Sequence, residues 1–288
     1  MANTIVWSKH DYVQRMRARI NKPTCWTDIL NVRYSDVRTI VQGAMTTEPA
    51  VQSGTRGSAY TYQDMTLSAD TLTISTYRVL PVLIDEADRY QQNYVDQMSI
   101  ADFQGKRINE YIEAQMLAQH GSFTDFGSTD LANTGADDTT QITVSSANVD
   151  DLIRAIKRKL YTNNGVDFAV EKGVFIVWRP ADFELLEAYV QANGYTEADI
   201  ALKNGIPVAK AFHYMGVDHY LSTQHTANHL FAGIKGMFEI GILRSTYGKA
   251  KFIEDPGSVS GLGIVSRVDY GWNQASYYIQ FSMDVNVA

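Results

Sequence analysis

Four of the six histidines lie within seventeen residues, and they are the side chains in this sequence best suited to binding a metal ion. They are His213, His219, His225 and His229. Neutral imidazole nitrogens are common zinc ligands. However, residues 226–228 have the composition of a turn, and no acidic residue nearby is spaced like a hydrolytic base. The pattern favours ordinary surface and interface histidines, and a metal-dependent hydrolase using the 213–229 cluster is the alternative.

Two glycine-rich segments partly match catalytic or nucleotide-binding motifs. In residues 257–261 a valine stands at the centre, where a nucleophile elbow requires serine. Residues 261–263 begin like a dinucleotide-binding loop but lack its third glycine and a clear strand-to-helix frame. We expect both segments to be turns. No catalytic residue, cofactor site or metal site is therefore predicted, and the chain is not expected to be an enzyme.

The composition is that of a globular protein, with 45% hydrophobic and 20% charged residues. Apolar runs such as residues 174–178 are far shorter than the roughly 18 residues needed to cross a bilayer. The first residues lack the apolar core of a secretory signal. A single cysteine, Cys25, excludes an internal disulfide and a thiolate zinc cage. We expect a chain that is made in a cytoplasm-like compartment, does not contact a membrane and is stabilised by packing.

The net charge of −7 is unevenly distributed, because residues 1–40 carry seven basic and three acidic groups. The remaining chain has a charge of about −11, which argues against tight binding of a phosphate backbone by the folded part. The amino-terminal segment is the plausible contact for a polyanion, and a solvated helix face is the alternative. Its cations are Lys9, Arg15, Arg17, Arg19 and Lys22.

The first half of the chain predicts a short helix, a projection and a hairpin. Apolar residues at helical spacing favour a helix that ends near Pro23. Residues 46–59 are rich in Gly, Ser, Thr and Pro and predict a mobile projection. Residues 60–83 alternate like two strands of a long hairpin, but neither face is uniformly apolar, so we expect a partner to cover them. The candidate interface residues are Leu67, Leu72, Ile74 and Tyr77.

Residues 85–120 predict one very long helix, because apolar residues recur every three or four positions. Asp85, Glu86 and Asp88 are expected in its first turn, where carboxylates complement the helix dipole. Gly105 is expected to mark a bend or a close packing contact within this helix. A surface loop should follow over residues 121–140.

The second half of the chain predicts a helix over residues 148–161, a buried strand over 174–178 and a helix starting at Pro180. After Pro207 and Val208, strands are expected near 217–221 and 230–232, and β-rich sequence closes the chain. The predicted fold class is therefore mixed α+β.

The order of these elements resembles the major capsid proteins of tailed double-stranded-DNA bacteriophages, the Hong Kong 97 fold. The similar segments cover most of residues 45–288, and each is degenerate, so the resemblance depends on their order and spacing. They are residues 72–86, 102–108 with 113–117, 173–183, 205–208, 228–242, and 270–271 with 277–285.

The resemblance implies four parts. These are an N-terminal arm (1–48), an extended β-hairpin loop (49–80), a peripheral domain with the long spine helix (81–165 and 262–288) and an axial domain (166–261). Copies of such a chain form hexameric and pentameric capsomers that close an icosahedral shell around packaged DNA. The resemblance places the chain in the virion, after assembly in the host cytoplasm. A nonviral, encapsulin-like shell enclosing enzyme cargo is the alternative.

The resemblance also implies partners. No sequence of coiled-coil character precedes residue 45, so a separate scaffolding protein is expected, together with a portal and possibly a decoration protein. Residues 48–80 contain no lysine, so isopeptide crosslinking through this loop is not expected. Double-stranded DNA should contact the inner face without sequence specificity. We expect Arg15, Arg17 and Arg19 to face the shell interior or an acidic neighbour.

Overall fold

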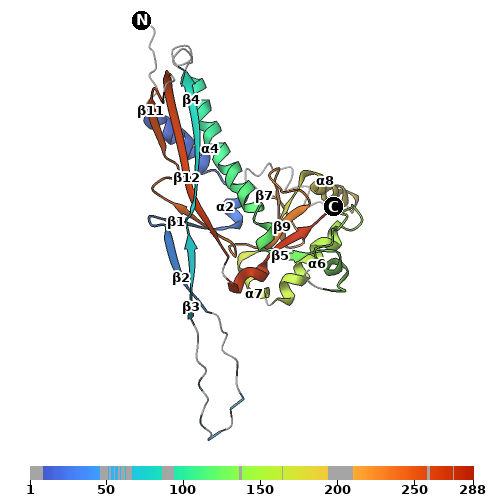
Figure 1. Cartoon of the computed structure of the whole chain (residues 1–288). Coiled ribbons are helices and arrows are strands. Elements are labelled where there is room, and N and C mark those ends of the chain that lie inside the picture. The colour runs from blue at the N-terminus through green and yellow to red at the C-terminus, as the bar shows by residue number, and fades with distance from the viewer. Residues whose placement is uncertain are drawn as a thin grey trace.

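The computed structural model describes residues 9–45, 67–85, 94–135, 138–163, 165–193, 210–257, 260–274 and 276–288, with a few isolated residues between 51 and 62. In these residues the strands form three sheets, which we call the long sheet, the compact sheet and the hairpin. The hairpin extends away from the rest of the molecule, and the compact sheet lies beside the lower end of the longest helix (Figure 1). Helices and strands are mixed throughout, as predicted.

The long sheet is built around one 13-residue strand, β12. β4 pairs antiparallel with it from Gly261 opposite Asp85 to Tyr270 opposite Thr76. β10 and β11 also pair antiparallel with β12, and β1 pairs in parallel with β10. The strands of this sheet are β1 (Asn31–Ser35), β4 (Thr76–Asp85), β10 (Glu239–Leu243), β11 (Ala250–Glu254) and β12 (Gly261–Asn273).

Two helices, α1 (Lys9–Ile20) and α4 (Tyr94–Leu117), lie along the long sheet. The buried residues of α1 are spaced four apart, as the sequence predicted: Tyr12, Met16 and Ile20. Those of α4 include Met98, Ala101, Ile108, Ile112 and Met116. They share one core with Ile84 of β4 and with Leu262, Ile264 and Val268 of β12. This spacing of three or four residues is what places one face of each helix on the sheet.

The compact sheet has six strands in the order β5-β13-β9-β6-β8-β7. Its central strand β6 is buried at all five residues, as predicted. Val174, Ile176 and Trp178 pack into one core and Phe175 and Val177 into the other, because successive side chains of a strand point to opposite faces. The strands are β5 (Thr124–Phe126), β6 (Val174–Trp178), β7 (Lys210–Tyr214), β8 (Val217–Leu221), β9 (His229–Ile234) and β13 (Ser282–Asn286).

The remaining elements lie mainly around the compact sheet. Leu152, Ile153 and Ile156 of α6 and Leu186 of α8 belong to the core on one face of that sheet. The proline at the start of α8 is in its first turn, as predicted. The elements are α2 (Cys25–Ile29), η1 (His120–Ser122), α5 (Ser128–Ala132), α6 (Val149–Thr162), α7 (Val166–Lys172), α8 (Pro180–Ala192) and η2 (Ser276–Phe281).

The predicted hairpin is wrong in its pairing. The hairpin is formed by β2 (Thr39–Met45) and β3 (Leu67–Thr73), which pair antiparallel from Thr39 opposite Thr73 to Met45 opposite Leu67. β4, the second expected strand, belongs to the long sheet instead. Strand partners are set by contacts distant in sequence, which the alternation within one segment does not encode.

The predicted start of the long helix at Asp85 is also wrong. Asp85 is the last residue of β4, so it is not in the first turn of α4. Glu86 and Asp88 lie outside the described residues. Strand β4, which contains several β-branched residues, continues through Asp85. The helix predicted over residues 85–120 therefore could not begin at that residue.

Residues 121–140 are not a plain surface loop, because they contain β5 and α5. Carboxylates organise this polar segment by accepting backbone hydrogen bonds. Asp130 accepts from the Gly127 amide at 3.1 Å, and Asp138 accepts from the Thr129 amide at 2.9 Å. Phe126 is fully buried. Residues 261–263 are likewise not a turn, because they begin β12.

The sheets do not follow the predicted domain boundaries. β10 and β11, within residues 166–261, belong to the long sheet with β4 and β12. β5 and β13, assigned to the other part, belong to the compact sheet. The two structural halves are therefore each assembled from segments far apart in sequence.

Candidate assembly surfaces

The root of the hairpin packs against the long sheet. Leu72 and Ile74 are buried, and a Cβ added at Gly241 would lie only 2.8 Å from Cδ2 of Leu72. A Cβ at Gly271 would overlap the carbonyl oxygen of Thr73. Glycine at both positions lets the backbone of one element approach the other closely. The hairpin root therefore packs closely against β10 and β12, because glycine leaves room for it on both strands.

Polar contacts also hold the hairpin root. Oε1 of the buried Glu239 accepts hydrogen bonds from Asn31 at 2.6 Å and Arg33 at 2.9 Å, and its Oε2 accepts from Gln42 of β2 at 2.7 Å. Asn273 of β12 donates to Asp70 of β3 at 3.0 Å. Hydrogen bonds to a charged, buried group are among the stronger ones. Each hairpin strand thus has its own tie to the long sheet.

These contacts correct part of the predicted interface. A neighbouring copy is not needed to bury Leu72 and Ile74, because their own chain already does. The side chain of Leu67 lies outside the described residues. Tyr77 is not on the hairpin but on β4, where it is 51% exposed.

β4 carries an exposed apolar strip on one of its faces. Tyr77, Val79 and Leu83 alternate along the strand and are 51%, 44% and 45% exposed, and we call these three residues the β4 strip. Side chains of the other parity lie toward the helix: Arg78 donates to the Tyr111 hydroxyl at 2.8 Å, and Ile84 is buried. The strip is a row of apolar side chains that the described part of the chain leaves in contact with water.

A groove of about 470 Å³ lies between β4 and α4. Its lining includes Val79, Leu80, Phe103 and Tyr111, together with the cation Arg107. Phe103 is 54% exposed, and the Arg107 guanidinium lies 5.0 Å from the centre of its ring. The groove therefore extends the apolar surface of the β4 strip toward the helix.

The basic residues of α1 have partners within the chain. Arg15 forms an ion pair with Asp102 of α4 at 2.7 Å, and Nε of Arg17 donates to the Gly248 carbonyl at 2.7 Å. Lys9 lies 3.8 Å from Glu254. Arg15 therefore has a counter-charge within its own chain, and Arg17 has a hydrogen-bond acceptor there. That these arginines and Arg19 face the shell interior or an acidic neighbour stays a prediction.

Gly105 of α4 lies directly against α1. A Cβ at this position would lie 2.9 Å from both the Met16 carbonyl oxygen and the Cβ of Arg19. On either side, Tyr12 donates to Gln104 at 2.9 Å and Asn109 donates to the Ile20 carbonyl at 3.2 Å. Of the two roles expected for Gly105, the geometry supplies a reason for the close packing contact.

A partly buried polar cluster links the amino-terminal segment to the compact sheet. The Tyr220 hydroxyl donates to Asp28 of α2, and Lys235 bridges Asp28 at 2.9 Å and Asp218 at 2.7 Å. Burial opposes ionisation of Asp28, but the hydrogen bonds from Tyr220 and Lys235 outweigh it and lower the pKa of that carboxyl. Burial also raises the pKa of the Cys25 thiol, so this cysteine is an inert packing residue.

The four clustered histidines are separated in the structure. His213 pairs with Asp218 at 2.6 Å, and His219 is buried and accepts a hydrogen bond from the Trp178 indole at 2.8 Å. Burial lowers the pKa of His225 to about 4, which keeps it neutral. A hydrolase built on these four side chains has no support in this geometry.

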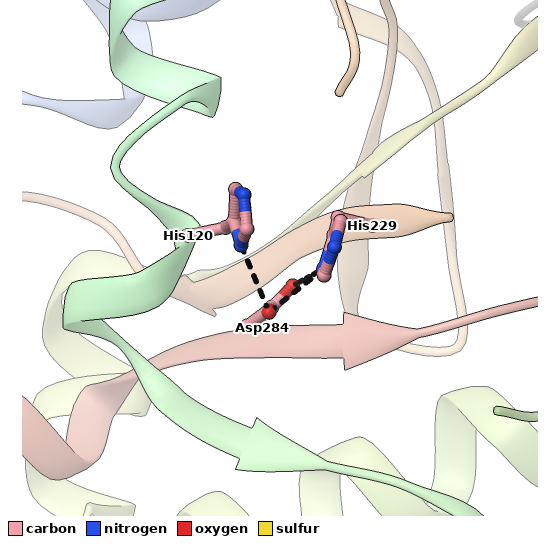
Figure 2. A group of neighbouring side chains, drawn as sticks. All are labelled: His120, His229 and Asp284. Atoms are coloured by element: carbon pink, nitrogen blue, oxygen red, sulfur yellow. Dashed lines mark hydrogen bonds and ion pairs between the residues drawn. The ribbon is translucent and has the colours of Figure 1, made fainter. Parts of the chain in front are cut away.

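His229 instead meets two residues that the sequence did not single out. It lies beside His120 and Asp284, and all three side chains converge (Figure 2). His120 and Asp284 are far from His229 in the sequence. No local spacing could have predicted this group, because it forms only when η1, β9 and β13 come together.

Comparisons with known proteins give matches in structure but not in sequence. No family model matches the chain, and no curated protein matches it. A chain from Mycobacterium phage Che8 has a TM-score of 0.62 at 13% identity, covering 91% of each chain. The capsid of Ralstonia phage GP4 has a TM-score of 0.61 at 7% identity, covering 93% of this chain and 92% of that one.

The capsid structure of the cyanophage P-SCSP1u covers all of this chain and 92% of its own, with a TM-score of 0.57 at 12% identity. No helix within the described ranges is both long enough and apolar enough to cross a membrane. Since the three matches extend over nearly the whole length of both chains, the shared feature is the complete architecture rather than one motif. The chain therefore has the fold of phage capsid structures, which the order of its sequence motifs had predicted.

Proposed function

We propose that this chain is the major capsid protein of a tailed double-stranded-DNA phage. In this role it assembles into hexamers and pentamers that form an icosahedral shell around packaged DNA. The observation that carries the proposal is the agreement in fold with phage capsids over nearly the entire chain. The function is structural, so the proposal requires no catalytic residue and no cofactor.

Two surfaces suit contacts between copies. The hairpin projects from the body on a root fixed by Glu239 and Asn273, which lets it reach a neighbouring copy. The β4 strip offers an apolar surface that a neighbour can cover. At about 25 cal/mol per Å² of apolar area, burying a few hundred Å² contributes several kcal/mol per subunit before ordering costs. In a closed shell every subunit makes this contact.

The remaining roles follow from the same proposal. The compact half would form the axial part that meets its copies at the capsomer centre, and α4 would be the spine of the peripheral part. With a net charge of −7, the shell would contact packaged DNA on its inner face without binding it tightly. A separate scaffolding protein, a portal and a decoration protein are the proposed partners. Assembly would take place in the host cytoplasm, and the product would be part of the virion.

Electron microscopy of the purified chain, alone and with a truncated hairpin, tests the proposal. Met45 and Leu67 are directly opposite each other, so an Asn-Gly turn can replace residues 46–66 without disturbing the root. We expect closed shells from the wild-type chain and only folded, soluble subunits from this variant. A Gly/Ser segment of equal length in place of residues 46–66 is the control that separates loop length from loop sequence.

Three results would contradict the proposal. Normal shells from the turn variant would show that the projecting segment is not needed for assembly. Small uniform shells that contain protein rather than DNA would favour the nonviral alternative. A wild-type chain that stays monomeric with hydrolytic activity would favour an enzyme.

A further inference from the structure

His120, His229 and Asp284 form a compact group from three separate segments (Figure 2). Nδ1 of His229 lies 2.9 Å from each Asp284 oxygen, and Nδ1 of His120 lies 3.4 Å from Oδ2. One potential ligand atom from each residue lies within 4.8 Å of the other two. Two imidazole nitrogens and one carboxylate oxygen therefore lie close enough together for a local adjustment to bring them to one ion.

The carboxylate of the group is buried, whereas its two histidines are partly exposed to solvent. The side chain of Asp284 is only 4% exposed, while those of His120 and His229 are 30% and 26% exposed. An ion could reach the histidines from solvent and still be held against a carboxylate shielded from water. An entry path of this kind is one requirement for a reversible metal site.

The polar groups around Asp284 are incompletely satisfied. Ser282 and Asn286 share a strand face with Asp284 because residues two apart point the same way, and both are buried. Among the described residues, neither the Ser282 hydroxyl nor the Asn286 amide nitrogen has a hydrogen-bond partner. Buried polar atoms of this type are normally paired, so an occupant such as a metal-bound water would complete their bonding.

The charge of the group also favours a bound cation. The basic partners recorded for the buried Asp284 carboxylate within the described structure are the two histidines of the group. A buried carboxylate is costly without a full counter-charge, and a divalent cation would supply one.

We propose that His120, His229 and Asp284 bind one divalent transition-metal ion, with Zn²⁺ as the reference ion and solvent completing its coordination. Two imidazoles and one carboxylate suit zinc and its neighbours, whereas Mg²⁺ and Ca²⁺ prefer oxygen ligands alone. In a tetrahedral zinc site the ligand atoms are about 3.3 Å apart, and the N–O distances of 2.9 and 3.4 Å bracket that value.

Binding requires one local rearrangement. The two imidazole rings are stacked, with centroids 3.8 Å apart and planes inclined by 23°. Both rings must rotate for their nitrogens to converge on one ion. Once bound, the ion joins the segment after α4 to two central strands of the compact sheet. The proposed role is therefore a structural link between the long helix and that sheet.

Equilibrium dialysis of the untagged, metal-free chain against Zn²⁺ tests the site. We expect about one tightly held equivalent per chain, competed by Co²⁺ but not by excess Mg²⁺. Loss of one ligand should weaken binding by more than the roughly 10–100-fold that loss of an outer-shell partner costs. The variants are His120→Ala, His229→Ala and Asp284→Asn. His213→Ala, which removes another histidine paired with a carboxylate, is the matched control and should leave binding unchanged.

Co²⁺ absorption provides a second readout that does not depend on stability. The wild-type chain should give visible bands typical of tetrahedral cobalt, and His120→Ala should lose them. Because His120 is partly exposed, this variant keeps the test valid even if Asp284→Asn fails to fold. Equal zinc retention by the wild type and His120→Ala would overturn the proposal.

One alternative result also overturns it. If the wild type retains no zinc, but its stability changes between pH 5 and 7 in a way that His120→Ala abolishes, the group is a proton-sensitive pair and not a metal site. Dialysis uses isolated subunits. Its outcome is therefore independent of whether the chain forms shells.

Discussion

The compact sheet and the long sheet differ in how completely the chain covers them. Every residue of β6 and β13 in the compact sheet is buried, and helices or aromatic side chains pack on both faces of that sheet. In the long sheet, β4 and β11 are mostly exposed or half-buried. The compact sheet is thus covered by other parts of its own chain. The long sheet, in contrast, keeps apolar side chains that its helices do not cover.

This difference indicates which half of the molecule contributes most to the free energy of unfolding and which half is exposed for contacts with other molecules. Burial of apolar side chains is the dominant favourable contribution to folding, so the compact half should determine the free energy of unfolding. The exposed side chains of the long sheet contribute little to that free energy. Under the proposed function, these side chains are available for contacts with other copies of the chain.

The strongest test of the comparison is Trp178→Ala in the compact sheet. Trp178 is fully buried and its indole donates to His219, so we expect a loss of about 3–5 kcal/mol in the free energy of unfolding, measured with urea. Phe103→Ala on α4, where the side chain is 54% exposed, is the control and should cost less than about 0.5 kcal/mol. Similar losses for the two variants would remove the contrast between the halves.

The next largest effect should come from a fall in pH, which should lower the free energy of unfolding through His225 in the compact half. Burial lowers the pKa of His225 to about 4, below the value of about 6.5 expected in the unfolded chain. As the pH falls from 6.5 to 4, the unfolded chain binds a proton that the folded chain does not. The His225 contribution therefore destabilises the fold by about 3 kcal/mol across this window.

The measurement is the difference between two urea-unfolding profiles over pH 4 to 7. His225→Gln carries no titrating ring, so its profile should lack this component of the acid loss while its stability near pH 7 changes less. Parallel profiles for the wild type and His225→Gln would show that the ring is protonated as easily in the folded state as in the unfolded one.

Gly105→Ala should have a smaller effect in the half built on the long sheet. Alanine gains about 1 kcal/mol over glycine in a helix, but overpacking typically costs 1–3 kcal/mol. Because the new Cβ would meet a backbone oxygen and the Cβ of Arg19, we expect a net loss of about 1 kcal/mol by urea denaturation. Gly43→Ala in β2, which has open space around it, should not lower stability.

The sign of the Gly105→Ala result also bears on the predicted bend. A gain in stability would show that α1 does not require glycine at this position. Comparison of immature and expanded shells would then be the way to decide whether α4 bends there. A loss would assign Gly105 to helix packing.

The smallest effect on folding is expected from the β4 strip. Val79→Ser with Leu83→Ser should change the free energy of unfolding by less than about 1 kcal/mol in total, because both side chains are half exposed. The same variant should strongly reduce the fraction of protein that sediments as shells. Val170→Ser on α7, where the side chain is 82% exposed, is the control and should leave assembly unchanged.

Local patterns in the sequence predicted the elements whose faces are fully covered. The buried residues of α1, α4 and α6, the strand β6 and the proline start of α8 follow from spacing alone. In each case the spacing of apolar residues within one helix or strand indicates which of its side chains are buried. The motif order was sufficient to indicate the capsid fold.

The features that sequence analysis missed depend on residues far apart. β3 pairs with β2 and β4 with β12, although both were expected to pair with each other. Leu72 is buried because Gly241 leaves room for it. The group of His120, His229 and Asp284 likewise depends on three segments meeting. Such contacts leave no periodic signal in any one stretch of the chain.

The parallel pairing of β1 with β10 has a consequence for synthesis. Asn31 lies opposite Glu239, so the first strand of the long sheet waits for a partner made 208 residues later. The hairpin root depends on the same late segment, since its ties are to Glu239 and Asn273. Pairing across such separations is slow, and domains fold as their segments leave the ribosome.

A nascent chain that stops before residue 239 therefore lacks both polar ties of its hairpin root, and one that stops before residue 273 lacks the tie from Asn273 to Asp70. The complete set of ties forms only when the chain is translated through β12. Under the proposed function, we expect the late position of Glu239 and Asn273 to keep prematurely terminated chains from joining a shell, because their hairpins are not fully held.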